Sequence, residues 1–281
     1  FTKLLEKKIC KLLRVRYVVM TTSGTISIFL ALKAAGIKRG DEVIVPNLTF
    51  PATANAVNLA GASPILVDVN NNNLLINEKS LIKKINKKTK AIIPVHVSGR
   101  GSNIKEILKI AKRKKLFVIE DAAEAFMSKI NRKYLGTFGE AGCFSFAPNK
   151  IITTGQGGVV VTNNKSIYQN LRELKDQGRI GPTTGGEDLY NSVGYNFKYT
   201  NLQAVLGLNQ LRTINKRVNI LKNHYKFYKE NLIQNKKFKL IGFDLKNGEL
   251  PLWTDVYSLN RNKLFKYLEK KGIFCRYFWH P

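Results

Sequence analysis

Short, uninterrupted apolar runs that alternate with helical segments are the feature that most constrains the fold of this chain. The runs lie at 43–45, 65–67, 91–93, 116–119 and 159–161. A continuous apolar run of this length is typical of a strand that is buried on both faces of a sheet. Strand, helix and strand in repeated order predict right-handed βαβ units. We therefore expect an α/β fold with a mainly parallel central sheet flanked by helices.

The segment between the third and fourth runs has the spacing of an amphipathic helix. Apolar side chains recur over 104–111 at helical intervals, which directs the lysines between them toward solvent. Asn103 and Glu106 stand where a capping pair would begin such a helix. We expect the helix to cover one face of the sheet.

The sequence pattern changes near residue 235. A long helix is predicted from Thr200, with Gln203 as its capping partner, to about Leu232, and a polar, Lys-rich connector follows it. We therefore expect a large domain over 1–234 and the start of a smaller C-terminal α/β domain over 235–281. The chain begins without Met and stops without a terminal signal, so we expect a fragment of a longer protein.

The charge balance is unusual and invites a nucleic-acid interpretation. The chain has 47 Lys and Arg against 19 Asp and Glu, which gives a net charge of +28. Because the basic residues are scattered rather than confined to one segment, we favour a solvated surface, and a basic nucleic-acid-binding protein is the alternative from a different class. Charged or Asn residues interrupt every apolar run, so we expect no membrane association.

The cysteines and histidines are widely separated in the sequence. They are Cys10, Cys143, Cys275, His96, His224 and His280. Their spacing fits neither a disulfide framework nor a metal site, so we expect no metal and a reducing, cytoplasmic location. We expect the histidines to be structural or exposed, with the strand end at His96 as a possible part of a pocket.

Four groups of residues at the predicted loop ends of the large domain could carry chemistry. Residues 22–25 precede a helical run, where free N–H groups could hold a phosphate, although an ordinary N-cap has the same pattern. Phe50 follows the first run and could cover a planar ligand, although such a ring is usually part of a core. Acids at 120–124 end the fourth run, and acids that interact with a helix dipole are the alternative there.

Lys150 is the fourth of these features. It stands between an apolar strand and the glycine-rich turn at 155–158, which is a poor position for a merely solvated charge. Burial there would favour the neutral amine, which is a nucleophile. Chemistry in an open α/β sheet gathers at the carboxyl ends of the strands, and the fourth run ends in Glu120 and Asp121.

Six motifs in this order resemble those of the DegT-type sugar aminotransferases. The motifs are Gly24-Thr25, 41–46, 49–55, 120–125, 149–155 and 194–196. The resemblance implies a pyridoxal-phosphate enzyme of the aspartate aminotransferase fold, also called fold type I. It also implies that glutamate donates an amino group to a nucleotide-linked keto sugar, in surface polysaccharide synthesis such as that of lipopolysaccharide O-antigen.

The resemblance assigns roles around the cofactor ring. Lys150 matches the lysine that holds the cofactor through a Schiff base, and Asp121 matches the carboxylate that faces the pyridine nitrogen. Glu124 matches a residue near the ring hydroxyl. Phe50 would stack on one face of the ring, and Ala123 would line the other.

The resemblance also implies a phosphate site and a second subunit. Gly24, Thr25 and Ser145 match the residues that hold the cofactor phosphate. Asn196 matches an asparagine that reaches the phosphate of the neighbouring subunit. The resemblance therefore implies a homodimer with a shared active site.

Some positions indicate which subgroup of the family this chain resembles, and others differ from the family pattern. Residues 149–155 are most similar to the perosamine synthases, which aminate C4 of a GDP-linked 4-keto-6-deoxy sugar, while an enzyme that aminates another sugar position or acts on amino acids is the alternative. Lys150 argues against the dehydratase branch, which has His there. Gln156 replaces the usual Glu and Lys198 the usual Arg. Arg276 resembles an arginine that meets an anionic substrate group, although a surface role is equally compatible.

Overall fold

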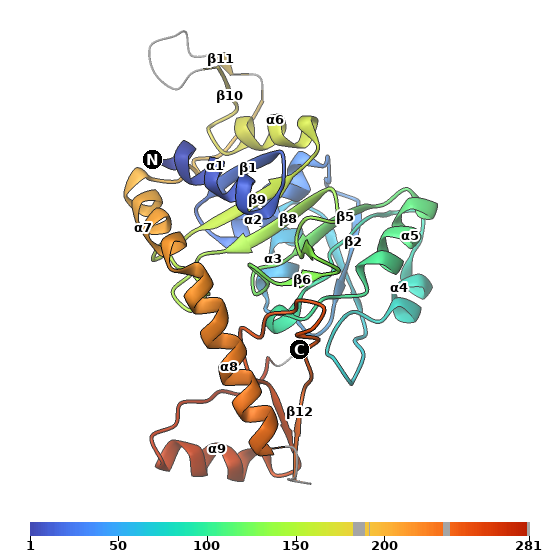
Figure 1. Ribbon diagram of the computed structural model, residues 1–281. Coiled ribbons are helices and arrows are strands. Elements are labelled where there is room, and N and C mark those ends of the chain that lie inside the picture. The colour runs from blue at the N-terminus through green and yellow to red at the C-terminus, as the bar shows by residue number, and fades with distance from the viewer. Residues whose placement is uncertain (182–188, 191, 233–236, 280–281) are drawn as a thin grey trace.

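The computed structural model describes residues 1–181, 189–190, 192–232 and 237–279 (Figure 1). The helices are α1 (Thr2–Leu13), α2 (Gly24–Ala34), α3 (Ala52–Leu59), α4 (Glu78–Lys84), the 3-10 turn η1 (Val97–Gly99), α5 (Ile104–Lys114), α6 (Lys165–Leu174), α7 (Asn201–Arg212), α8 (Ile214–Leu232) and α9 (Arg261–Lys270). The central strands are β1 (Tyr17–Thr21), β2 (Glu42–Pro46), β3 (Ser63–Val67), β4 (Thr89–Ile92), β5 (Phe117–Asp121), β8 (Ala141–Ser145) and β9 (Gly158–Thr162). The short strands are β6 (Lys129–Ile130), β7 (Lys133–Tyr134), β10 (Arg179–Ile180), β11 (Leu189–Tyr190), β12 (Phe238–Leu240) and β13 (Val256–Ser258).

The central sheet confirms the predicted α/β architecture. Its seven strands follow the order β1-β9-β8-β5-β4-β2-β3. Neighbouring strands from β8 to β3 are parallel, and only β9 runs antiparallel to both of its neighbours. The carboxyl ends of β1, β2, β4, β5 and β8 therefore meet at one edge of the sheet, together with the amino end of β9.

Helices cover both faces of this sheet, because successive strand residues point to opposite sides. Val43 and Val45 pack into the cluster that contains much of α2, whereas Ile44 between them packs with the apolar residues of α5. The expectation of burial on both faces is wrong for β3, where Leu66 is 55% exposed. The reason is that β3 is an edge strand and pairs with β2 alone.

The predicted helix at 104–111 is confirmed as α5, and its lysines are exposed. Its predicted capping pair is wrong. Asn103 precedes the helix without a side-chain cap, and Glu106 instead forms an exposed ion pair with Lys109 at 3.4 Å.

The long helix predicted from Thr200 is two helices in the structure. The capping box with Gln203 is confirmed at the start of α7, but α7 ends at Arg212 and α8 begins at Ile214. Between them the Thr213 hydroxyl donates to the carbonyl of Gln210 at 3.3 Å, and such local bonds compete with continued helix. The domain boundary expected between 234 and 235 lies outside the described residues.

After α8 the chain leaves the sheet and then returns to it (Figure 1). β12 and β13 form a small antiparallel pair next to α9. Residues 249–255 lie against the loop that follows β4, where Leu252 N–H donates to the Ser98 carbonyl at 2.9 Å. This return brings C-terminal side chains to the carboxyl edge of the sheet. Within the part of the chain that the structure describes, no helix is long and apolar enough to cross a membrane.

Candidate active site

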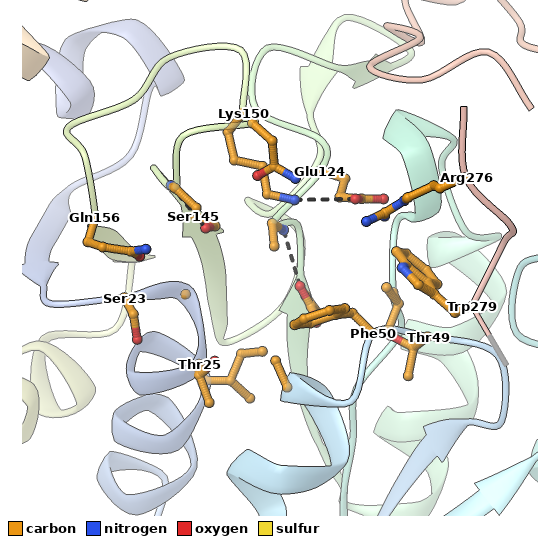
Figure 2. A pocket seen from close by; sticks show the side chains of 18 residues that line it. Ser23, Thr25, Thr49, Phe50, Glu124, Ser145, Lys150, Gln156, Arg276 and Trp279 are labelled. Carbon is orange, nitrogen blue, oxygen red and sulfur yellow. Dashed lines mark hydrogen bonds and ion pairs between the residues drawn. The ribbon is translucent and has the colours of Figure 1, made fainter. Parts of the chain in front are cut away.

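A cavity of about 290 Å³ opens at the carboxyl edge of the sheet (Figure 2). Eight of the nine site residues expected from the sequence line it. They are Gly24, Thr25, Phe50, Asp121, Ala123, Glu124, Ser145 and Lys150. The expected strand-end position of the chemistry is therefore what the fold produces, and these residues come from five separate parts of the chain.

The first helix after β1 supplies an anion site to this cavity. The Ser23 hydroxyl caps α2 by accepting from Ile26 N–H at 3.2 Å. Among the described residues, the N–H groups of Gly24 and Thr25 have no acceptor, so both are available to an anion. A Cβ at Gly24 would lie 2.9 Å from the Cβ of Ser145, so glycine allows the helix end and the Ser145 strand to approach each other.

Asp121 is a buried carboxylate at the end of β5. Its Oδ2 accepts from the Thr53 hydroxyl at 2.7 Å, and its Oδ1 accepts from Ala123 N–H at 3.1 Å. Burial raises the pKa of Asp121, and the hydrogen bonds with Thr53 and Ala123 and the charge of Lys150 oppose this rise. Within the described ranges Asp121 has no ion-pair partner. A cationic group bound in the cavity would stabilise the ionised carboxylate.

Lys150 lies opposite this carboxylate and pairs with Glu124. The Lys150 Nζ atom is 3.2 Å from Glu124 Oε1, and both side chains are largely buried. Glu124 also accepts from Ser98 N–H at 2.9 Å and from the Trp253 indole N–H at 3.1 Å. Glu124 therefore connects the lysine to the loop after β4 and to the returning C-terminal segment.

Aromatic and cationic side chains close the outer part of the cavity. Phe50 is 55% exposed, and its ring centroid is 6.3 Å from that of Trp279. Arg276 points into the cavity from the C-terminal segment (Figure 2). The alternative that Phe50 is a core residue is therefore wrong, since its ring faces a ligand-sized space.

These features fit pyridoxal phosphate. The free N–H groups at Gly24 and Thr25 suit its phosphate, and the Asp121 carboxylate without an ion-pair partner suits its protonated ring nitrogen. Lys150 supplies the amine that its aldehyde requires, and Phe50 supplies an exposed ring. The residues would hold the group with its phosphate at α2 and its ring beside β5.

Asn196 is the one expected site residue that does not line the cavity. It is exposed, and its backbone forms a bridge with Asp176. The role implied for it needs a second subunit, so it stays a prediction. Lys198, which departs from the resemblance, forms an ion pair with Asp176 at 2.9 Å, and Gln156 lines the cavity.

The histidines lie outside the site. His96 is fully buried and bonds to Glu120 at 2.9 Å, so it has a structural position rather than one in the cavity. His224 is exposed on α8, and His280 lies outside the described residues. In the described part of the chain, no three His, Cys, Asp or Glu side chains gather to hold a metal ion.

Sequence reasoning assigned no role to several residues that the structure brings to the site. Thr53 stands inside a recognised motif, but only the fold shows that its hydroxyl meets Asp121, 68 positions away. Ser98, Trp253 and Trp279 carried no local signal at all. Their contacts depend on the return of the C-terminal segment to the sheet.

A mainly parallel sheet with an anion site, a buried carboxylate and a paired lysine at its carboxyl edge defines an α/β enzyme with a site for a phosphorylated, cationic ring. Comparison with known proteins agrees with this class. The chain belongs to the DegT/DnrJ/EryC1/StrS aminotransferase family, whose sequence profile matches residues 1–281. The predicted family and fold class are therefore confirmed.

Individual relatives carry more specific names. The chain is 42% identical to GDP-perosamine synthase of Escherichia coli O157:H7, over 81% of this chain and 62% of that protein. It is 33% identical to GDP-perosamine synthase of Vibrio cholerae, over 98% of this chain and 76% of that protein. A crystal structure of a DegT DnrJ EryC1 StrS aminotransferase from Brucella abortus superposes with a TM-score of 0.90 at 30% identity, over 99% of this chain and 75% of that one. The chain thus spans less than two thirds of the length of the E. coli relative.

Proposed function

We propose that this protein is a pyridoxal-phosphate-dependent aminotransferase that moves an amino group from glutamate to a nucleotide-linked 4-keto-6-deoxy sugar. Membership of the aminotransferase family and similarity to two proteins named GDP-perosamine synthase support the reaction class and the sugar. The product would enter a surface polysaccharide such as lipopolysaccharide O-antigen. The three free cysteines are consistent with a protein that functions in a reducing cytoplasm.

The observation that carries the proposal is the convergence of three chemically distinct groups on one cavity. An amine at Lys150, a buried carboxylate at Asp121 and free N–H groups at the start of α2 line the same space of about 290 Å³. A phosphorylated cationic ring uses all three.

Each residue has a task that follows from its position. Gly24 and Thr25 would bind the phosphate with backbone N–H groups, and the Ser145 hydroxyl lies beside them. Asp121 would stabilise a proton on the ring nitrogen, which makes the bound cofactor an electron sink for the bond changes of transamination. Phe50 would lie against one face of the ring, and Ala123 leaves room at the other.

Lys150 would move the proton that transamination requires. Its Nζ atom, once free, can take a proton from one carbon and return it to another, which is general acid–base catalysis. Glu124 holds this amine at 3.2 Å and keeps it directed into the cavity. Because the cavity walls include Phe50 and Trp279, closure of the site over a sugar nucleotide would also exclude water.

A homodimer with a large domain over 1–234 and a smaller one over 235–281 completes the proposal. Support for the dimer comes from α7, where Leu202 is 82% exposed and Leu206 is 53% exposed. Exposed apolar side chains on one helix suit contact with a second copy. Asn196, which stands shortly before α7, would then reach the phosphate of the neighbouring subunit.

The decisive experiment is product analysis. The purified protein, loaded with pyridoxal phosphate, is incubated with glutamate and either GDP- or dTDP-linked 4-keto-6-deoxy sugar, and the products are identified by mass spectrometry and NMR. We expect a 4-amino sugar on the GDP-linked substrate. Turnover of small keto acids with no sugar nucleotide would favour an amino-acid enzyme, and a different aminated carbon would assign another sugar position.

A further inference from the structure

We infer that Trp253 is a positioning residue for Lys150 and acts through Glu124. This inference rests on the proposed function. The indole N–H of Trp253 donates to Glu124 Oε1 at 3.1 Å, and Lys150 Nζ lies 3.2 Å from the same oxygen. The tryptophan does not line the cavity, so this shared oxygen is the hydrogen-bonded route by which it would influence the amine.

The carboxylate between them is held from three directions. Ser98 N–H occupies Oε2 at 2.9 Å, while Trp253 and Lys150 share Oε1. Ser98 has φ of 56°, a left-handed conformation that is uncommon for a residue with a Cβ. The backbone at this position thus adopts a strained form with its N–H directed at Glu124.

Trp253 is fixed in turn by the segment that carries it. Leu250 N–H donates to the Ser128 hydroxyl at 3.0 Å, and Leu252 N–H donates to the Ser98 carbonyl at 2.9 Å. Asp255 forms an ion pair with the buried Arg100 at 2.5 Å. The indole is therefore placed by bonds on both sides of it in the chain.

The shared oxygen has two consequences for the amine. The Trp253 N–H stabilises the negative charge on Oε1 of Glu124. The attraction between this oxygen and the Lys150 ammonium is therefore weaker than it would be without the indole donor. The same donor holds Glu124 in place when the lysine moves away to react. Lys150 is thus directed into the cavity without being bound too tightly to leave.

The step that this arrangement affects is the attachment of Lys150 to the cofactor. The neutral amine of Lys150 would condense with the aldehyde of pyridoxal phosphate, so that a carbon–nitrogen double bond replaces the carbonyl bond and the carbonyl oxygen leaves as water. The ammonium form must first give up its proton. The other charged groups near this amine are Asp121, which is electrostatically coupled to it, and Arg276 in the cavity wall.

The test compares Trp253→Phe with the wild type by the rate of attachment of pyridoxal phosphate to the apoprotein across neutral to alkaline pH. Attachment is trapped with borohydride and located by peptide mapping. The phenylalanine keeps an aromatic ring near Arg276, whose guanidinium lies 6.0 Å from the centroid of the Trp253 ring. We expect the variant to attach about three- to tenfold more slowly near neutral pH, with its rate profile displaced to higher pH, since a donor to a charged group is lost. Profiles that coincide would overturn the inference.

Two further variants separate donation from packing. Trp253→His keeps a ring N–H and is expected to stay nearer to the wild-type profile than Trp253→Phe. A His profile displaced as far as the Phe profile would assign the effect to lost volume and overturn the inference. In a Glu124→Gln background the charge on the shared atom is gone, so Trp253→Phe should change the profile little.

Tyr257→Phe is the matched control for the returning segment. Its hydroxyl donates to the Asn71 carbonyl at 3.1 Å and not to Glu124, so the variant also removes one neutral hydrogen bond. We expect its attachment profile to equal that of the wild type. A displacement equal to that of Trp253→Phe would show a general loosening of the segment and overturn the inference.

A spectroscopic measurement on the unmutated site does not depend on how these variants fold. The protein contains two tryptophans, so an indole ¹⁵N spectrum has two signals, which Trp279→Phe assigns. We expect the Trp253 N–H signal to move downfield when Lys150 leaves the shared oxygen on attachment. An unmoved signal would overturn the inference, whereas failure of the wild type to attach the cofactor at Lys150 would overturn the proposed function instead.

Discussion

The two faces of the end of β5 carry adjacent carboxylates with opposite surroundings. Glu120 is fully buried and accepts from four donors, which are His96 Nε2–H and the N–H groups of Gly136, Phe138 and Gly139. Asp121 accepts from two donors and faces the cavity. The first carboxylate is satisfied within the protein and the second is left short of partners. Two neighbouring carboxylates thus have different roles: Glu120 stabilises the fold, and Asp121 is available to a ligand.

The hydrogen bonds around Glu120 also define the state of His96. Ser102 N–H donates to His96 Nδ1 at 3.2 Å, so the ring proton belongs on Nε2, which donates to Glu120. This side of β5 therefore joins two loops to the strand. The comparison predicts that changes on the Glu120 side act on stability, and that changes on the cavity side act on the reaction.

The largest effect is expected for Lys150→Ala. Loss of the amine removes both the covalent attachment and the proton transfer, so transfer activity should fall by about 10⁴-fold or more. Because Glu124 keeps its bonds from Ser98 and Trp253, the free energy of unfolding of the apoprotein should fall by less than in Glu120→Ala. Measurements are coupled-assay kinetics and urea unfolding, with Lys109→Ala on the exposed face of α5 as control. Retention of activity would contradict the division between the two faces.

Glu120→Ala should produce the largest loss of stability. It leaves four donors without an acceptor, of which two are buried and two are half-buried, and each buried group left unpaired costs about 1–3 kcal/mol. Urea or thermal unfolding of the apoprotein measures this loss. Glu106→Ala on the surface of α5 should stay within about 0.5 kcal/mol of the wild type. Equal stability of the two variants would break the comparison.

Asp121→Asn should lower kcat by on the order of 10²-fold, as removal of an electrostatic stabiliser commonly does. The same substitution should increase the free energy of unfolding of the apoprotein at neutral pH. Burial raises the pKa of Asp121 in the folded state above its unfolded value. The stability that this acid contributes is therefore present at pH below its ordinary pKa and is lost as pH rises through the raised value.

The asparagine variant lacks this titration. At neutral pH its apoprotein should be more stable than the wild type, and its unfolding free energy should change less between acidic and neutral pH. Thermal melts across this pH range make the measurement. An apoprotein that loses stability on this substitution would show that Asp121 belongs with Glu120 as a structural acid.

The smallest effect is expected for Thr53→Val. The hydroxyl of Thr53 donates to Asp121 at 2.7 Å, and its loss should destabilise the apoprotein at neutral pH by about 0.5–1.5 kcal/mol. The pKa of Asp121 should rise further, since the hydrogen bond now lowers it. A pH-dependent melt measures both effects. Thr53→Ser keeps the donor and should match the stability of the wild type. A serine variant as unstable as the valine variant would assign the effect to packing.

The sequence alone predicted the parts of the site that local pattern controls. Gly24 and Thr25 line the cavity, as the motif before a helical run predicted, and so does Lys150, a charge that stands between a strand and a glycine-rich turn. Apolar runs predicted five of the seven central strands, which are β2, β3, β4, β5 and β9, since burial on both faces leaves a continuous pattern. The apolar pattern does not indicate whether a strand lies at the edge of the sheet, and for this reason the exposure of Leu66 was not predicted.

Long-range contacts account for what the sequence could not predict. Trp253 reaches Glu124 across 129 positions, and nothing near either residue indicates the other. The break at Thr213 lies within an otherwise helical pattern, and the Thr213 hydroxyl there donates to the Gln210 carbonyl. Asn196 lies away from the cavity, and its expected role requires atoms from a second chain.

The return of the C-terminal segment also sets the order in which the site can be completed during synthesis. A ribosome that has released the chain as far as the end of α8 has already supplied Lys150, Asp121 and the start of α2, but Glu124 gains its last donor only when Trp253 emerges. The cavity of the nascent sheet is therefore incomplete until that late segment docks beside Gly99. A side chain at position 99 would collide with the Leu250 carbonyl, so the docking needs glycine there. A premature stop codon before this segment would thus leave Glu124 and Lys150, encoded far upstream, without that donor.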